Sequence, residues 1–445
     1  MIILGFLQFL FVFAITIYEL KKKSPVVFLW AVLLIMFGIP HFLSVASGEI
    51  EYSKEVMNTA SIFVLLFSLI FFISRYLIGK PFNQTKHKDR TEVIRKKEII
   101  ISNTKDRNNI IILVIILTII VIYQIYTNIQ SVGGIGNISW GNLREANEDR
   151  DYVDFSSITR ILYFLFSGIL LYLFINNRKK SFLGVAILIL FRTFMGGNRI
   201  NITPLLAAIV SIIILNIKNI RIKHIIVFGI LGLFAIYFIY SLRVFRHYGT
   251  IENFVENFNW SDFNSRVLLY LRTDNGELGL RTHFYYFIDN NNSFQNFNKG
   301  HTYIRMILMP IPTRFSFGLK PTDFAHSMGS AVGMAKGGSV HPTLFGDVYA
   351  NFGNLGFFMG IFWALFAYVG DRIIIKSPSS IKKSLLFMLY SSMYIIIARG
   401  SVYNGFFYIG WGVIFIYISN IMNRITITPQ NNHSTFISDL NRRRN

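Results

Sequence analysis

Cysteine is absent from this 445-residue chain, which excludes disulfide bonds, cysteine-ligated metals and a thiol nucleophile. Acidic residues are few: 23 Asp and Glu stand against 44 Lys and Arg, which gives a formal charge of +21. No internal sequence repeat is visible, and this disfavours secondary transporters built from repeated halves. We expect no Asp-x-Asp carboxylate pair in the outer segments, which favours metal-independent chemistry there.

Apolar residues dominate the chain. They make up 53% of it, and the mean hydropathy is +0.47, too high for a soluble protein. Apolar runs long enough to cross a bilayer as helices recur along the sequence, so we predict an all-α, polytopic membrane protein with about eleven transmembrane helices. The predicted spans are 2–18, 25–45, 57–78, 110–130, 158–176, 181–196, 201–217, 224–241, 353–370, 384–398 and 401–420.

The charges between these spans alternate in sign, which indicates the topology because Lys and Arg near a span resist translocation. Basic turns occur at 21–23, 79–109, 178–180, 218–223, 372–383 and 442–444, and acidic or mixed turns at 49–55 and 145–154. We therefore predict an N-terminus outside and a C-terminus in the cytoplasm. The net charge then reports topology and contact with lipid headgroups, and we exclude nucleic acid as a partner.

This topology divides the chain into four parts. Residues 1–241 form a membrane bundle of about eight spans. Residues 242–342 form one large extracytoplasmic loop with short interfacial helices, residues 343–421 the C-terminal spans, and residues 422–445 a basic cytoplasmic tail. In polytopic proteins a single large loop usually marks the working face.

The large loop is rich in side chains that recognise anionic sugars. Its histidines are His247, His283, His301, His326 and His341, and its basic residues include Arg243, Arg246, Arg266, Arg272, Arg281, Arg305, Arg314 and Lys320. Tyr, Phe, Trp and Asn, which stack on sugar rings and bond their hydroxyls, are also frequent there. Each residue alone fits an ordinary solvated loop, but the set favours an anionic, sugar-bearing ligand.

Three arginines lie at the predicted outer ends of spans. Arg192 and Arg199 flank the glycine pair of FRTFMGGNRINITP, and Arg399 lies in IIIARGSVYNG. Each can extend to the membrane interface, or the three can gather a phosphate through bidentate guanidinium contacts. Further along, His341, Asp347 and Tyr349 lie where the loop becomes a membrane helix, after a segment in which two prolines predict an interfacial or re-entrant course.

The order of a GNR turn, RTDNGELGLR, PIPTRFSFGLKP and HPTLFGDVYANFGNLGFF resembles the Wzy-type O-antigen or oligosaccharide repeat-unit polymerases. This resemblance implies a GT-C-like, inverting, metal-independent glycosyltransferase in the bacterial cytoplasmic membrane. It implies undecaprenyl-diphosphate-linked oligosaccharides as donor and acceptor, the lipid bilayer and a chain-length regulator protein as partners, and no cofactor. It matches Arg199, Arg314, Lys320 and Tyr349 to family motifs, together with Pro321, Asn351, Phe352, Gly353 and Gly356.

The expected reaction joins a sugar hydroxyl to a glycan that leaves its lipid diphosphate, and arginines neutralise the charge of the leaving group. A general base must accept the hydroxyl proton, and the candidates are His341, Glu277 and Asp347. The predicted substrate-binding residues are Arg192, Arg199, Arg281, Arg305, Arg314, Lys320, Tyr349 and Arg399.

Two other functions remain open. An O-antigen ligase has almost the same architecture and donor but a different acceptor. A lipid-linked oligosaccharide flippase is also polytopic and basic, but flippases have about twelve to fourteen spans in two similar halves and no large outer domain. The single large loop therefore favours an enzyme.

Overall fold

The computed structural model of the chain is helical throughout the part that it describes. That part comprises residues 1–48, 52–83, 104–134, 155–195, 203–217, 219–247, 256–272, 279–291, 299–311, 315–331, 340–377 and 379–425. The first half contains α1 (Ile2–Lys22), α2 (Val27–Leu33), η1 (Leu34–Gly38), α3 (Ile39–Ser47), α4 (Lys54–Asn83), α6 (Thr104–Ser131), α8 (Phe155–Ile175), α9 (Lys179–Met195), α10 (Thr203–Asn216) and α11 (Ile222–His247). The second half contains α13 (Trp260–Arg272), α14 (Leu280–Asp289), α15 (His301–Ile307), α16 (Phe324–Ala331), α17 (Thr343–Phe352), η5 (Gly353–Phe358), α18 (Met359–Lys376), α19 (Ser380–Ala398) and α20 (Val402–Ile425).

Within the described residues, 6 helices are long and apolar enough to cross a membrane. They are Ile2–Lys22, Val27–Ser47, Lys54–Gly79, Val114–Ser131, Thr343–Lys376 and Ser380–Ala398. Shorter apolar helices cover Thr203–Asn216, Ile222–Phe234 and Val402–Tyr417. The predicted all-helical membrane protein is thus confirmed, whereas the count of eleven spans stays a prediction.

Helix α19 forms the centre of the bundle. It packs against α2, α8, α10, α18 and α20, and most of its side chains are buried. Its contact with α8 is close enough that a Cβ atom built on Gly168 would lie 2.5 Å from the Cα of Leu385. Small residues at such crossings let two membrane helices approach at backbone distance. The region around α19 is therefore a rigid base for the elements at its two ends.

A wide turn interrupts the second membrane helix. Residues Leu34–Gly38 form a π-helical turn between α2 and α3, and Pro40 follows in the first turn of α3. Proline has no N–H to donate and crowds the preceding turn, so the regular α-helical pattern gives way before it. The interruption brings His41 to the buried face of α3, where it contacts Tyr285 of α14.

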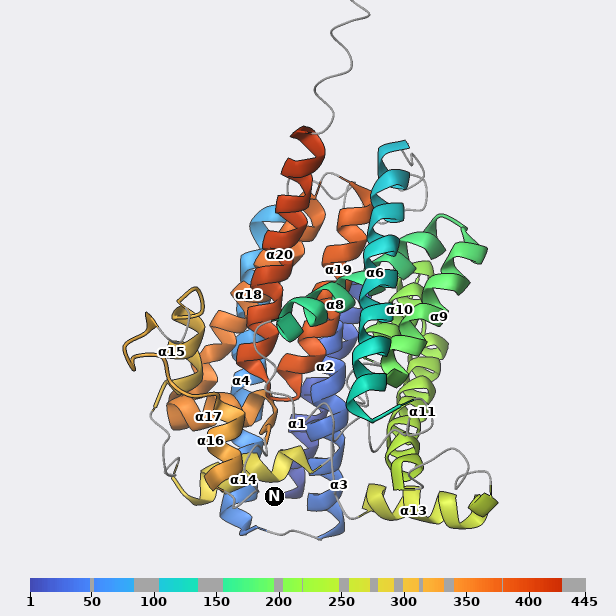
Figure 1. Ribbon diagram of the computed structural model, residues 1–445. Helices are drawn as coiled ribbons and strands as arrows, with labels where there is room; N and C mark the ends of the chain where they lie inside the picture. The colour runs from blue at the N-terminus through green and yellow to red at the C-terminus, as the bar shows by residue number, and fades with distance from the viewer. Residues whose placement is uncertain are drawn as a thin grey trace, which may run out of the picture.

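Most of the described helices of the polar segment lie at one end of the bundle (Figure 1). Figure 1 shows α13, α14, α16 and α17 at the same end as the N-terminus, with the C-terminal end of α20 at the opposite end. Helices α1 and α18 both run away from the N-terminal end, so their basic last turns, at Lys22 and Lys376, lie at the far end. This arrangement agrees with a polar segment and an N-terminus on one side of a membrane. Helix α11 continues to His247, past the predicted domain boundary at residue 241.

A buried ion network lies near the far end. Arg75 of α4 donates from Nε to Glu19 Oε1 at 3.0 Å and from Nη2 to Glu19 Oε2 at 3.2 Å. The same guanidinium contacts Asp371 of α18, whose other carboxylate oxygen accepts a hydrogen bond of 2.8 Å from Ser24. Arg75 and Glu19 are 3% and 0% exposed. One arginine therefore ties α1, α4 and α18 together.

Candidate active site

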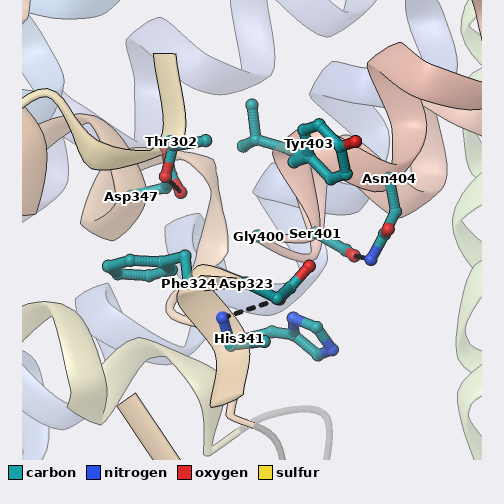
Figure 2. Close-up of a pocket in the computed structure, with 11 residues that line it drawn as sticks. Thr302, Asp323, Phe324, His341, Asp347, Gly400, Ser401, Tyr403 and Asn404 are labelled. Atoms are coloured by element: carbon teal, nitrogen blue, oxygen red, sulfur yellow. Dashed lines mark hydrogen bonds between the residues drawn. The ribbon is translucent and has the colours of Figure 1, made fainter. Parts of the chain in front are cut away.

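A cleft lies where the polar segment meets the C-terminal membrane helices. It is lined by α15, the start of α16, the turn before α17, α17 itself, the turn between α19 and α20 and the start of α20. About 190 Å3 of space lies between these residues, open solvent included. The polar residues that line it are Thr302, Asp323, His341, Asp347, Ser401, Tyr403 and Asn404. Figure 2 shows Asp347 beside Thr302 on one side, with the imidazole of His341 and the carboxylate of Asp323 on another.

Asp347 is the fully buried acidic residue of the cleft. It is fully buried on α17, and its Oδ2 accepts a hydrogen bond of 2.9 Å from the hydroxyl of Thr302. Asn351, one turn further along, donates to Thr302 Oγ1 at 3.1 Å, while its own Oδ1 accepts from the backbone N–H of Thr302 at 2.9 Å. A buried carboxylate is tolerated only when such donors surround it. These contacts fasten α15 to α17, which favours a positioning role for Asp347.

His341 and Asp323 are more accessible. His341 is partly exposed in the turn before α17, and Asp323 is partly exposed just before α16. Asp323 Oδ1 accepts the backbone N–H of Ala325 at 3.0 Å, a capping contact that fixes the carboxylate at the start of the helix. An imidazole and a carboxylate thus border the same cleft, where a hydroxyl group of a ligand can reach them.

The backbone of the cleft is unusual at two positions. Thr343, a fully buried β-branched residue, has a φ of 62°, and its N–H donates to the carbonyl of Arg399 at 3.2 Å. Gly400 has a φ of 101°, and a Cβ atom there would lie 2.6 Å from the nitrogen of Thr343. Only glycine permits this approach of the 399–401 turn to the start of α17. Strain of this kind at a non-glycine residue is typical of functional sites.

A cationic cluster borders the cleft. The Arg305 guanidinium lies 4.4 Å from the ring centre of Tyr403, and its Nη1 donates to the carbonyl of Pro321. Burial lowers the pKa of the Lys320 ammonium group, and the positive charge of the nearby Arg305 lowers it further. His301 Nε2 donates a hydrogen bond of 2.7 Å to the carbonyl of Thr322, and burial is the main cause that lowers the pKa of His301. The cluster is therefore a concentrated positive site with a neutral histidine beside it.

The structure brings together part of the predicted site. His341 and Asp347 line the cleft, Arg305 and Lys320 border it, and Arg399 immediately precedes the turn that closes it. The two remaining described side chains lie elsewhere. Arg281 is buried on α14, close enough to act electrostatically on His41, and the ring of Tyr349 packs between Phe63 and Phe284 while its hydroxyl donates to Asn354 at 3.1 Å.

Several predicted positions fall outside the described residues. Arg199, Glu277 and Arg314 belong to this group, and for Arg192 the structure describes the backbone, in α9, but no side-chain position.

The part of the chain that is described contains no group of three or more His, Asp or Glu residues that could hold a metal ion. The expectation that the outer segments lack an Asp-x-Asp pair is wrong, because Asp149 and Asp151 form one in the predicted outer turn 145–154, outside the described residues. Metal independence thus stays a prediction.

Five polar residues of the cleft were not predicted from the sequence: Asp323, Thr302, Ser401, Tyr403 and Asn404. Asp323 was detectable as the helix-capping residue of the KPTDFAHS stretch, because Asp before a helix accepts the first free N–H groups. Thr302, Tyr403 and Asn404 carry no comparable signal, since they join the cleft only when α15 packs against α17 and α20.

The chain matches no protein-family model, no curated protein and no solved structure.

Proposed function

We propose that this protein is a membrane glycosyltransferase that polymerises lipid-diphosphate-linked oligosaccharide repeat units into a surface polysaccharide, on the outer face of the bacterial cytoplasmic membrane. One observation carries the proposal. His341 and Asp323 border a single cleft at the end of the bundle that holds the polar segment, and the cationic Arg305 and Lys320 lie directly beside it. A proton acceptor next to an anion-binding group is what transfer from a diphosphate requires.

The proposed reaction is a direct displacement at the anomeric carbon. The acceptor hydroxyl oxygen forms a bond to that carbon while the bond to the diphosphate oxygen breaks, and the lipid diphosphate leaves with the bonding electron pair. His341 accepts the hydroxyl proton, since it is more accessible than the fully buried Asp347. Arg305 and Lys320 stabilise the charge that develops on the diphosphate, and a displacement from the opposite face inverts the configuration.

The chemistry is tested with purified protein and a lipid-linked repeat unit. We expect chain elongation by the wild type and a loss of turnover of roughly 10²- to 10⁴-fold in His341→Ala, with donor binding nearly unchanged, because general-base assistance acts in the transition state. His224→Ala is the matched control, since His224 is also partly buried but lies at the start of α11. An active His341→Ala enzyme would move the base to another residue, and a loss of wild-type activity with a chelator would refute the metal-free mechanism.

A deletion strain distinguishes the polymerase from the ligase. Loss of a polymerase leaves single repeat units on the lipid, whereas loss of a ligase leaves complete long chains on it. We expect single repeat units. Accumulation of long lipid-linked chains would assign the same cleft to the transfer of finished polymer, and normal lipid-linked glycans with normal surface polysaccharide would refute both enzymes.

A further inference from the structure

An apolar surface extends from α15 to the segment before α16. Five large apolar residues on it are well exposed, Ile304, Ile307, Ile311, Phe317 and Leu319, and we call this set the apolar flank. Phe317 is 92% exposed, Ile307 78% and Leu319 71%. In a membrane protein, exposed apolar residues of this kind mark contact with lipid, a ligand or a partner.

The apolar flank lies beside the apolar helix α20. Helix α15 packs against α20, and the methyl group of Met309 lies 3.0 Å from the position of a Cβ atom on Gly410. Gly410 is eight residues after the first residue of α20, which corresponds to about 12 Å along a helix. The flank therefore continues an outer surface of α20 on which Trp411 and Ile414 are also exposed. Figure 1 shows α15 alongside the bundle, nearer its middle than α14 or α16.

Two cations lie among the apolar residues of the flank. The Nε atom of Arg305 is buried and has no hydrogen-bond partner among the described residues, and Lys320 Nζ donates to the carbonyl of Ile311 at 2.8 Å. In the described part of the chain, no carboxylate forms an ion pair with either side chain. Two neighbouring cations that form no ion pair within the described residues attract an anion, and a guanidinium suits the oxygens of a phosphate.

We propose that the apolar flank is the entry site of the lipid-linked substrate: its isoprenoid chain lies on Ile307, Phe317 and Leu319, and its diphosphate reaches Arg305 and Lys320. This inference rests on the proposed function and adds the side from which the substrate arrives. Arg305 stacks on Tyr403, and Tyr403 also lines the cleft, so this contact connects the flank to the proposed site of reaction. A diphosphate at Arg305 is thereby placed next to His341 without leaving the membrane surface.

Binding of a sugar-free polyprenyl diphosphate to the protein in phosphatidylcholine nanodiscs tests the site. Replacing Leu319 by Ser removes apolar contact with the chain, and we expect binding to weaken roughly tenfold. Replacing Arg305 by Gln removes the phosphate contact, with a loss of roughly tenfold to a hundredfold. Leu233→Ser on α11 is the matched control, since Leu233 is 68% exposed against 71% for Leu319. This control should bind like the wild type.

The same assay contains the outcomes that overturn the proposal. If Leu319→Ser and Leu233→Ser weaken binding of the probe equally, the flank holds no substrate chain. The same conclusion follows if Leu319→Ser and Phe317→Ser both bind the probe like the wild type. Phosphatidylglycerol that competes as well as the polyprenyl diphosphate would assign the surface to ordinary anionic phospholipid. A protein that binds the probe through the flank but transfers no sugar would refute the proposed function and leave the lipid site standing.

Discussion

The ion network around Arg75 offers the sharpest test of how the bundle is held together. Arg75 forms a bidentate ion pair with Glu19 and a further ion pair with Asp371, and both Arg75 and Glu19 are almost completely buried. The methionine variant Arg75→Met keeps most of the side-chain volume and removes the charge. It leaves two carboxylates facing each other, of which Asp371 is 22% exposed and Glu19 not at all.

The expected cost follows from this burial. Removing one partner of a buried ion pair typically costs about 3–5 kcal/mol, because the remaining charge is left without compensation. Asp371→Asn should cost only about 1 kcal/mol, since the contact between Arg75 and Glu19 remains and Asp371 reaches solvent. The triple variant Glu19→Gln, Arg75→Met and Asp371→Asn carries no buried charge in the network, so it should recover most of the stability lost in Arg75→Met.

Thermal unfolding in detergent micelles, followed by intrinsic fluorescence, measures all four proteins. We expect the midpoint to fall by several degrees for Arg75→Met, to change little for Asp371→Asn and to return toward the wild-type value in the triple variant. An Arg75→Met protein as stable as the wild type would show that the network contributes nothing. A triple variant as unstable as Arg75→Met would show that lost packing, rather than uncompensated charge, causes the effect.

Three further predictions concern packing, protonation and sidedness. Gly168→Ala should destabilise the protein by about 1–3 kcal/mol because its Cβ atom would meet the backbone of α19. Gly229→Ala should stabilise α11 by about 0.5–1 kcal/mol, because its Cβ atom would have nothing within 4 Å. Chemical unfolding of both variants compares their free energies of unfolding. Burial lowers the pKa of His283 from 6.5 to about 4, so only the unfolded state binds this proton between these pH values. Stability should therefore fall as the pH drops from about 6.5 toward 4, and His283→Gln should flatten that part of the pH profile. In a chain that has no cysteine, Asn290→Cys should react with an impermeant thiol reagent on intact cells and Lys21→Cys should not; the reverse result would invert the proposed orientation.

The class of fold could be predicted because it depends on composition and on the length of apolar runs. The run at 25–45 predicted one continuous span, and the structure has a helix there that is interrupted at Leu34–Gly38. Pro40 is a signal for that interruption, but its position does not determine whether the helix kinks, widens or ends. The charges of the network were hidden for a different reason. Glu19, Arg75 and Asp371 are far apart in sequence, and only packing reveals that they neutralise one another.

The candidate site could be predicted only where one segment carries the signal. His341 and Asp347 lie within a single stretch at the start of a membrane helix, so their proximity follows from the sequence. Their partners in the cleft come from α15, the start of α16, Ser401 and the start of α20, and no periodicity or motif connects these segments. Arg281 is a different case. As a basic residue in a polar loop it was predicted to bind substrate, and the structure buries it on α14, close enough to act electrostatically on His41, so its role stays a prediction.

The strained turn at Thr343 explains why the cleft lies at this point of the fold. A β-branched residue at a positive φ costs of order 1–3 kcal/mol, so the surrounding packing must impose it. Here the imposing contact is the bond from the Thr343 N–H to the Arg399 carbonyl, at the end of the buried helix α19. His341 lies two residues before Thr343, and Tyr403 lies three residues after Gly400. The central helix of the bundle therefore fixes the separation between the proposed base and the ring on which Arg305 stacks, and the position of the polar segment depends on the same contact.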